Sequence, residues 1–436
     1  MNTRALKERL YEAIDRSAEA VERYVRDIQK HPELGFAEYR TAEKMAQFFR
    51  EIGLEPQTGL AVTGMAADLD SGKSGPTIAF MGELDAIVCR QAPYADPETG
   101  AAHQCGHHVQ QGVLLAAAAG FTSSGVLQEL CGRIRFLGAP AEEMGSSAVC
   151  QPLREQGKIQ YICGKQELIR QGVLDDVDIS MMMHCWSHHP GPLILRGVRN
   201  LGAVTLLLNF YGKQAHAAAE PFNGINALNA AIAGINAVNA MRESFDESES
   251  PRVNYIITHG GEMVNCIPDF VQVKVNIRAN TLAGMERLTR RVVNAFRLGA
   301  ECIGARMECQ AEPGIMPLVT DDTLYNLYTE NAKEFVPPEE YQIVPTMPSS
   351  SDLGDVSQLM PVLYPMCGGI EGTGHGSDFQ MVDFQNAVVL PAKLLGAVII
   401  DLLAEDGKLA KEVVEQYKPG MTKEQYLHYW EKQGQD

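Results

Sequence analysis

The sequence predicts an α/β protein in which a doubly wound domain with a mainly parallel central sheet is interrupted by an inserted βαββαβ domain. Three observations support this prediction. Apolar runs typical of buried parallel strands alternate with helical patterns in the first half of the chain. A middle segment alternates apolar and polar residues, as strands with one solvent-facing side do. The last part returns to a buried strand and a long apolar helix.

The elements of the first half follow from residue periodicity. Residues 4–29 predict an amphipathic helix, because apolar side chains recur at helical spacing from Leu10 to Ile28. A second helix is expected from about residue 38 to residue 52. Buried strands follow, with an alanine-rich helix between the first two, at Thr77–Met81, Val109–Phe121 (the helix), Ile134–Leu137 and Ile179–Met183.

The middle segment has the order of a compact open-faced sandwich that can fold by itself. It predicts, in chain order, strand, helix, two strands, helix and strand at Val204–Tyr211, Ala227–Met241, Val253–Thr258, Val271–Ile277, Ala283–Ile303 and Arg306–Gln310. After it, a strand is expected at Val362–Met366 and a long helix at Ala387–Leu403. We therefore expect a discontinuous catalytic domain of residues 1–199 and 317–436, interrupted by a small inserted domain of residues 200–316.

Composition limits the classes of function. The 436 residues are 45% hydrophobic and 21% charged, as in globular proteins, and the chain is long enough for two good cores. The formal charge of -18 argues against nucleic acid or an anionic membrane as partner. The start lacks a signal-like apolar core, and no apolar run reaches the length of a bilayer span. The ten cysteines are scattered without CxxC pairs, so we expect a reducing, cytoplasmic compartment.

The segment Cys105-Gly106-His107-His108 lies directly before an expected helix. Residues two apart on a helix face different ways, so Cys105 and His107 converge only where the chain turns, and Gly106 permits that turn. The helix N-terminus favours a thiolate. Thiolate, imidazole and carboxylate together suit Zn, Mn, Co or Ni, and ligand type does not choose among them. Alone, the pattern is more often a buried cysteine beside surface histidines.

Carboxylates and further histidines follow other buried strands. Because adjacent carboxylates are not easily buried together, Glu142 and Glu143 are most simply one general base and one metal ligand, although an isolated pair would be a solvated turn. Their position after a strand, where α/β proteins bind ligands, favours function. His184 ends one apolar run and His375 lies in a glycine-rich loop. Taken singly, these are a core histidine and a loop residue.

Glu83 and Asp85 come at the end of the first buried strand. Asp85 can hold a ligand histidine in one tautomer, whereas Glu83 and His108 are candidates without an assigned role. Five distant segments thus each bring a metal ligand or an acid–base residue to a strand end or the loop after it. This joint placement favours a metal-dependent hydrolase.

Seven strings taken together resemble the aminoacylase/glutamate carboxypeptidase family of metallohydrolases. The resemblance is to its amidohydrolase branch, which includes aminobenzoyl-glutamate, hippurate and indole-acetyl-amino-acid hydrolases. The strings occur in the family's order between about residues 31 and 380, and they are HPELGFAEYRTAE, MGELDAI, CGHH, GAPAEEMGSS, GKQAHAAAEPFNGINAL, GGEMVNCIP and SSSDLGDVSQLMP.

The resemblance implies two divalent metal ions per subunit, of unresolved identity, and a homodimer formed through the inserted domain. By this resemblance, Cys105 bridges both ions, His107 and His184 bind one ion, and Glu143 and His375 bind the other. Glu142 is the general base, and His216 reaches into the partner's site to donate to the oxyanion. Asn265 binds the substrate's carbonyl and Arg278 its carboxylate.

The implied reaction is hydrolysis, by a metal-activated water, of the amide bond of a small N-acyl amino acid or aminoacyl-glutamate-type substrate with a carboxylate. A dipeptidase or aminopeptidase-like exopeptidase and a deaminating aminohydrolase remain open. An acidic side chain facing the pocket would favour the dipeptidase, which must recognise a free amine. A catalytically dead binding protein is least favoured, because Glu142 and every implied ligand are present.

The chain departs from the branch in four places, one of which is the unusual pair His188-His189. His108 stands where the branch usually has Asp or Asn, which changes the charge next to the metals. The stretch Gln160–Arg170 has the character of an insertion near the site, and Cys89–His103 is long. We therefore expect a substrate unlike that of the better-known members.

Overall fold

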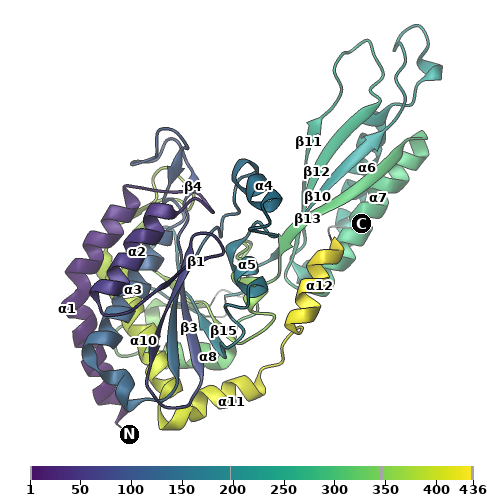
Figure 1. The fold of residues 1–436 in the computed structure, drawn as a ribbon. Coiled ribbons are helices and arrows are strands. Elements are labelled where there is room, and N and C mark those ends of the chain that lie inside the picture. Colours follow the sequence, from purple (N-terminus) through teal and green to yellow (C-terminus); the bar gives the residue numbers. More distant parts are fainter. Residues whose placement is uncertain (1, 197, 344–346, 434–436) are drawn as a thin grey trace. The chain divides into compact units, whose positions relative to one another are not determined.

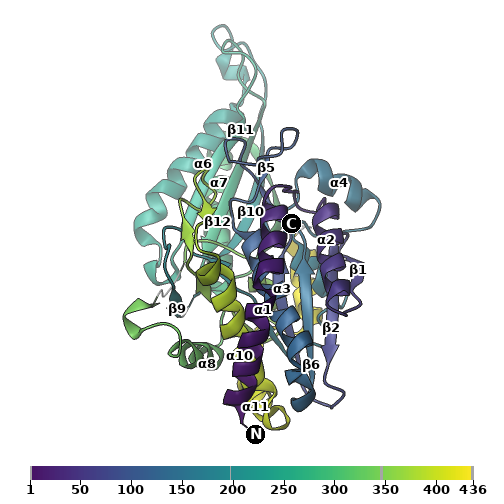
Figure 2. The same cartoon turned by 90° about the vertical axis from the view of Figure 1, so that its left-hand side faces the viewer.

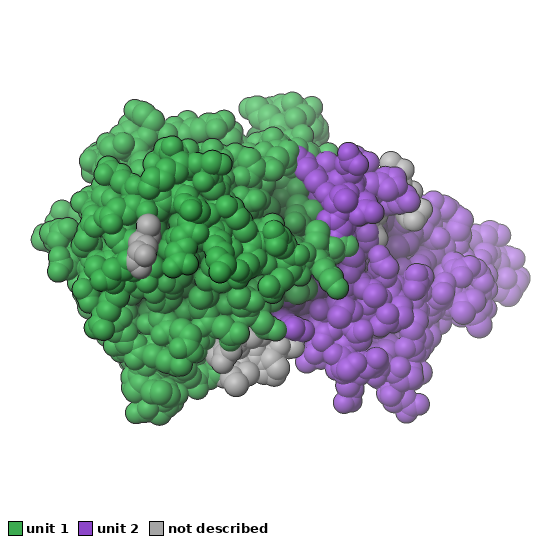
Figure 3. All heavy atoms as spheres, turned by 90° about the horizontal axis from the view of Figure 1, so that it is seen from below, with its two compact units in different colours: residues 1–198, 319–345, 355–420 green, residues 199–318, 346–354, 421–436 purple. Residues whose placement is uncertain are grey.

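The computed structural model describes residues 2–196, 198–343 and 347–433. The chain forms two compact units: unit 1 contains residues 1–198, 319–345 and 355–420, and unit 2 contains residues 199–318, 346–354 and 421–436. Figure 3 colours unit 1 green and unit 2 purple. The described residues 347–354 and 421–433 thus belong to unit 2, whereas the sequence analysis assigned them to the catalytic domain. The expected domain boundaries remain predictions.

A six-stranded sheet forms the centre of unit 1 (Figure 1). Its strands are β1 (Gln57–Leu60), β2 (Gly64–Asp70), β3 (Thr77–Glu83), β6 (Arg133–Ala139), β7 (Ile179–Met181) and β15 (Val362–Leu363). They run in the order β1-β2-β6-β3-β7-β15. The pairs from β6 to β15 are parallel, and the pairs of β2 with β1 and β6 are antiparallel. The expected mainly parallel sheet is confirmed, with two further antiparallel strands at one end, β1 and β2, that the sequence analysis missed.

Helices cover this sheet. Helix α3 (His107–Ser124) packs on β3, and α1 (Thr3–Gln29) and α10 (Leu390–Leu403) pack against α3 (Figure 2). Small apolar residues let α3 be buried almost all round, whereas α1 is amphipathic and begins at the capping side chain of Asn2. The other helices are α2 (Tyr39–Glu51), α4 (Ser147–Glu155), α5 (Gly164–Arg170), α8 (Asp322–Ala332), α9 (Leu353–Val356) and α11 (Lys408–Gln416).

One helical stretch of unit 1, Gln385–Leu403, has the length and apolar composition of a membrane span. It starts with a π-helical turn, Gln385–Val389, and continues as α10. Because 78% of its most apolar window is buried inside the folded chain, it has the environment of a core helix. One or two such helices are weak evidence for a membrane protein.

Two strands expected as single runs are each divided in the structure. The run expected at 179–183 becomes β7 and β8 (His184–Cys185), and the run expected at 362–366 becomes β15 and β16 (Met366–Cys367). β8 and β16 pair in parallel with each other, outside the central sheet. Pro365 lies at the break and lacks an N–H, but its carbonyl accepts the N–H of His184 at 3.0 Å. This bond places His184 just beyond the end of the central sheet.

Unit 2 contains the predicted βαββαβ arrangement. In chain order its elements are β10 (Gly202–Tyr211), α6 (Ala227–Met241), β11 (Arg252–His259), β12 (Phe270–Ala279), α7 (Leu282–Ile303) and β13 (Arg306–Ile315). The four strands pair antiparallel in the order β11-β12-β10-β13. Alternate residues of β12 are buried in a core shared with α6 and α7. A further helix, α12 (Lys423–Gln433), packs against β13.

The remaining strands are short pairs that connect loops. They are β4 (Ile87–Val88) with β5 (Ala101–Ala102), β9 (Ile194–Arg196) with β14 (Tyr341–Ile343), and β17 (Ile370–Glu371) with β18 (Gln380–Met381).

Candidate metal centre

Side chains at strand ends and loops of unit 1 converge into three groups that could hold a metal ion. In each group the ligand atoms lie within 4.8 Å of one another. The first two groups share a cysteine, and the first and third share a histidine. They are Cys105, His107 and His184; Cys105, Glu143 and His375; and Glu83, His107 and Glu142.

The turn before α3 brings the first group together. Gly106 has a φ of 99°, and a Cβ there would lie 2.8 Å from the sulfur of Cys185, so this position requires glycine. The turn leaves the sulfur of Cys105 3.4 Å from Nε2 of His184. Burial raises the pKa of the Cys105 thiol well above its usual value. A thiolate here therefore needs a cation beside it.

Asp85 contacts two of the candidate ligands. His107 Nδ1 lies 2.9 Å from the carbonyl oxygen of Asp85 and 3.1 Å from its Oδ1, while the backbone N–H of Glu143 donates to Oδ2 at 2.9 Å. Nδ1 of His107 therefore carries the hydrogen, and Nε2 keeps its lone pair. Nε2 is buried and has no hydrogen-bond partner among the described residues, although two carboxylates lie close to it. Such an atom, beside thiolate and carboxylate donors, fits a divalent ion.

Glu142 and Glu143 follow β6, where the chain turns at Ala141 with a φ of 49°. Glu143 Oε1 lies 3.2 Å from Nε2 of His375. Burial would raise the pKa of Glu143, but the bond from His375 outweighs it and lowers that pKa; the same bond raises the pKa of His375. Glu142 lies with Oε2 3.9 Å from Nε2 of His107, close enough to serve a water between them.

Glu38 supports this turn, a role that sequence reasoning missed. It is fully buried, and its carboxylate accepts the N–H of Ala141 at 2.8 Å and the hydroxyl of Thr63 at 2.6 Å. Burial first, and then the charge of Asp85, raise the pKa of Glu38 to about 8. Glu38 belongs to the string HPELGFAEYRTAE, but nothing in that string indicates which backbone it holds.

Lys165 was also missed. Its ammonium lies 2.6 Å from Oε1 of Glu83, and both side chains are fully buried. Burial alone would raise the pKa of Glu83, but Lys165 and then His107 lower it to about 2. Lys165 lies on α5, inside the stretch Gln160–Arg170, and no pattern marked it because its partner is far away in the sequence.

His108 lies outside all three ligand groups. Its ring is buried 5.2 Å, between centroids, from the ring of His103, and the nitrogens of both rings have no hydrogen-bond partner in the described part of the chain. Burial lowers the pKa of both residues, that of His108 to about 3. The side chain of His108 is therefore neutral, although it stands where the branch usually has Asp or Asn.

Three predicted residues lie in unit 2. Nδ1 of His216 accepts the backbone N–H groups of Ala218 and Ala219 at 3.2 and 3.1 Å, so its Nε2 carries the hydrogen and can donate. Asn265 is in the neighbouring segment, where its carbonyl accepts the N–H of Ala217 at 2.9 Å. Arg278 lies on β12 and donates from Nη1 to the carbonyl of Pro348 at 3.2 Å.

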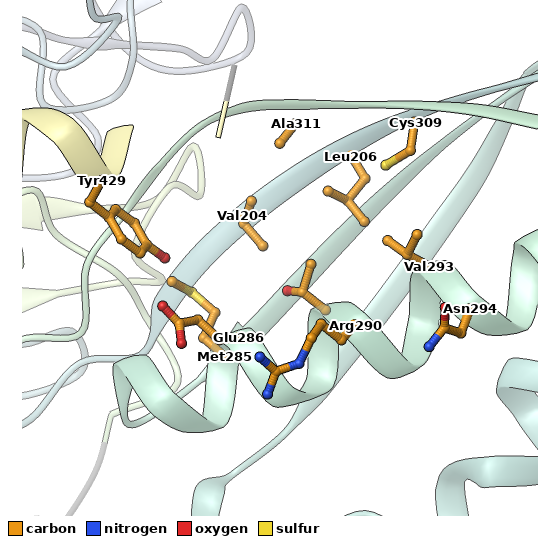
Figure 4. Close-up of a pocket in the computed structure, with 11 residues that line it drawn as sticks. Val204, Leu206, Met285, Glu286, Arg290, Val293, Asn294, Cys309, Ala311 and Tyr429 are labelled. Atoms are coloured by element: carbon orange, nitrogen blue, oxygen red, sulfur yellow. The ribbon is translucent and has the colours of Figure 1, made fainter. Parts of the chain in front are cut away.

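A pocket of about 320 Å³ adjoins Glu143 and His375. Its other lining residues are Leu34, Gly35, Ala86, Ile87, Val88, Met144 and Ser146, all in unit 1. A groove of about 510 Å³ lies in unit 2 between α7 and β13, with Tyr429 of α12 at one end (Figure 4). None of the predicted site residues is among the described residues that line this groove.

The sequence matches a known domain and several known hydrolases. Residues 198–300 match the peptidase dimerisation domain of the M20 type. The Xaa-Arg dipeptidase of Mus musculus is 27% identical over 97% of this chain and 94% of its own length. One of the subunits of the p-aminobenzoyl-glutamate hydrolase of Escherichia coli is 28% identical over 76% of this chain and 66% of its own length.

Solved structures share the fold. A putative aminohydrolase from methicillin-resistant Staphylococcus aureus superposes with a TM-score of 0.79 at 21% identity, covering 91% of this chain and 100% of that one. A dinuclear metal-binding peptidase of the M20 family from Bacillus subtilis superposes with a TM-score of 0.69 at 20% identity, covering 89% and 99%.

The fold, the donor set and these similarities define a metal-dependent hydrolase of the amidohydrolase and peptidase class. Within that class, the matched dimerisation domain and the related hydrolases agree with the resemblance to the aminoacylase/glutamate carboxypeptidase family.

Proposed function

We propose that this protein hydrolyses the amide bond of a small N-acyl amino acid or aminoacyl-glutamate-type substrate at a centre of two divalent ions. The observation that carries the proposal is the convergence of Cys105, His107, Glu143, His184 and His375 in two overlapping groups with Glu142 beside them. Bound divalent ions lower the pKa of water and polarise a carbonyl. Mn, Zn, Co and Ni all suit this donor set.

The chain's own residues supply the remaining steps. Glu142 accepts the proton of the attacking water and returns it to the leaving amine. The Nε2 hydrogen of His216 is available for the oxyanion. The guanidinium of Arg278, whose Nε donates to Asn276 and whose Nη1 donates to Pro348, binds the substrate's carboxylate in this proposal. Asn265 binds the substrate's carbonyl in this proposal.

The pocket beside the metal ligands favours an apolar acyl group. Its lining contains Leu34, Ile87, Val88 and Met144, and its one acidic member is Glu143, itself a proposed ligand. A free amine on the substrate would need an acidic side chain to pair with it. The described lining therefore supports an N-acyl substrate more than a dipeptide.

A dipeptidase is the second candidate, because the relatives aligned over almost the whole chain are Xaa-Arg dipeptidases of mouse and human. We would measure kcat/KM on hippurate-like acyl amino acids, aminobenzoyl-glutamate and Xaa-Arg dipeptides. The proposal expects the acylated substrates to be preferred. A preference for dipeptides, lost when their amine is acetylated, would favour the second candidate, and no turnover of any amide would overturn both.

A homodimer through unit 2 is part of the proposal. Strand β11 is a sheet edge, and Ile256 and Ile257 on it are 62% and 43% exposed, so the edge can pair with another strand. The backbone of His216 pairs with that of Cys266 in an isolated β-bridge. Cys266 precedes Phe270 at the start of β12, whereas Arg278 lies near the end of β12. The eight steps from Phe270 to Arg278 span about 26 Å. Within one subunit, His216 and Arg278 therefore lie too far apart to contact the same small substrate. This distance supports His216 acting in the partner subunit's site.

The cysteines support the proposed cytoplasmic location. All ten lie in the described part of the chain and none forms a disulfide, as expected of a reducing compartment.

A further inference from the structure

We propose that Glu83 is a ligand of the metal ion that His107 holds, and that Lys165 fixes the carboxylate of Glu83 for this task. The inference rests on the proposed metal centre. It adds a carboxylate ligand and a positioning residue to the set that the family resemblance implies.

The first argument is the geometry between two lone pairs. Nε2 of His107 lies 3.0 Å from Oε2 of Glu83. Since Asp85 holds Nδ1 of His107, Nε2 presents a lone pair to a carboxylate oxygen that also presents one. Two such atoms repel at this distance unless a cation serves both.

An ion beside the two atoms fits better than a proton between them. Although the atoms are close, Nε2 of His107 makes no hydrogen bond of acceptable geometry with any described residue. Ligands about 2.0–2.2 Å from one ion, at angles between a right angle and a tetrahedral angle, lie about 2.8–3.6 Å from each other. The separation of 3.0 Å between His107 and Glu83 falls within this range.

The second argument is how firmly Glu83 is held. Nζ of Lys165 lies 2.6 Å from Oε1, the side-chain amide of Gln110 donates to Oε2 at 2.7 Å, and that of Gln111 donates to the carbonyl of Glu83 at 2.8 Å. Because a carboxylate oxygen has two lone pairs, Oε2 keeps one for an ion after its bond from Gln110. Lys165 holds the other carboxylate oxygen, Oε1, in place.

The competing explanation is a buried ion pair that only holds α5 to β3. The two explanations differ in what the pair does to metal binding, because a purely structural pair changes stability and leaves both ion affinities alone. The measurement is therefore metal affinity rather than activity. It uses Zn²⁺ against a chromophoric chelator, and the absorption of bound Co²⁺, on metal-stripped protein.

The variants are Glu83→Gln, Lys165→Met and the double variant, with Lys7→Met as the matched control. Lys7 pairs with Asp401 at 2.7 Å elsewhere in unit 1. We expect Glu83→Gln to lower the affinity for one of the two ions about 100-fold, and Lys165→Met to lower the affinity for the same ion about 10-fold. The second ion, and both ions of the control, should bind as in the wild type.

Wild-type affinity for both ions in Glu83→Gln would overturn the inference. If the single variants do not fold, the double variant decides in the same way, because it leaves no unpaired buried charge. The outcome is separable from the proposed function: two ions in the wild type, one of them weakened by Glu83→Gln, without amide turnover would reject that function and keep this assignment. If the wild type bound no ion, both the proposed function and this assignment would be rejected.

Discussion

Asp85 and His107 are joined by a contact of 3.1 Å between Oδ1 and Nδ1, in a fully buried site. The other carboxylate oxygen of Asp85 accepts the N–H of Glu143. One side chain after β3 thus orients a candidate ligand at the start of α3 and another in the loop after β6. Contacts with neighbouring side chains therefore hold the centre together, in addition to any bound ion.

Replacing Asp85 by Asn tests this relationship. An amide cannot accept on both sides, so either the N–H of Glu143 loses its acceptor or Nδ1 of His107 keeps only the backbone carbonyl of residue 85. We expect the Zn²⁺ affinity to fall about 10- to 100-fold. Asp15→Asn, on exposed α1, is the control for the loss of one carboxylate. Unchanged affinity in Asp85→Asn would show that Asp85 does not orient the ligands.

Glu38 predicts a specific pH dependence of stability. Its pKa is raised from 4.5 to about 8 by burial and by Asp85, so the folded state keeps a proton that the unfolded state has lost between these values. This contribution is full below the unfolded pKa and is lost as the pH rises through about 8. Wild-type stability should therefore fall, relative to that of Glu38→Gln, between about pH 5 and pH 8.5 in urea unfolding. A constant difference between the two proteins would contradict the raised pKa.

The edge strand β11 predicts the outcome of a single charged substitution. Ile256→Lys places an ammonium on the exposed apolar edge, where it should oppose pairing with another strand. We expect sedimentation to show a dimer for the wild type and a monomer for this variant. Leu298→Lys is the control, since Leu298 is 59% exposed on α7 of the same unit. A wild-type monomer, or dimers in both variants, would contradict an interface at β11.

Mixing two inactive variants tests whether His216 acts in the partner subunit's site. Subunits with His216→Ala keep Glu142, and subunits with Glu142→Gln keep His216. After exchange of equal amounts, half of the dimers are mixed and each has one intact composite site, so about a quarter of wild-type activity should return. If His216 acts within its own subunit, no activity returns.

Particular elements show what sequence patterns can predict. All seven residues of β3 are buried, and a continuous apolar run is the local signature of such a strand, so the central sheet was predictable. The alternating burial of β12 made the inserted domain predictable in the same way. β1 and β2 were missed because neither has such a run: β1 is mostly exposed and β2 is buried in its first half only.

The site residues also differ in whether a local sequence pattern predicts them. Asp85, Cys105 and Glu143 follow strands or precede a helix, and these positions carry chemical meaning without knowledge of the contacts. Lys165 and Glu38 act through partners 82 and 103 residues away in the sequence. Such pairings depend on how helices and loops pack, which one sequence does not encode in any local period. The role of Glu83 was open for the same reason, because Lys165 was not placed.

The central claim is that this centre performs metal-dependent amide hydrolysis with Glu142 as the base. The most direct measurement is the turnover of acyl amino acids by metal-stripped protein restored with Mn, Zn, Co or Ni, for the wild type and for Glu142→Gln. We predict that metal restores the wild type, and that Glu142→Gln binds the same amount of metal but loses about 10²- to 10⁴-fold in kcat. Restored activity that survives in Glu142→Gln, or turnover by the stripped protein, would contradict the account.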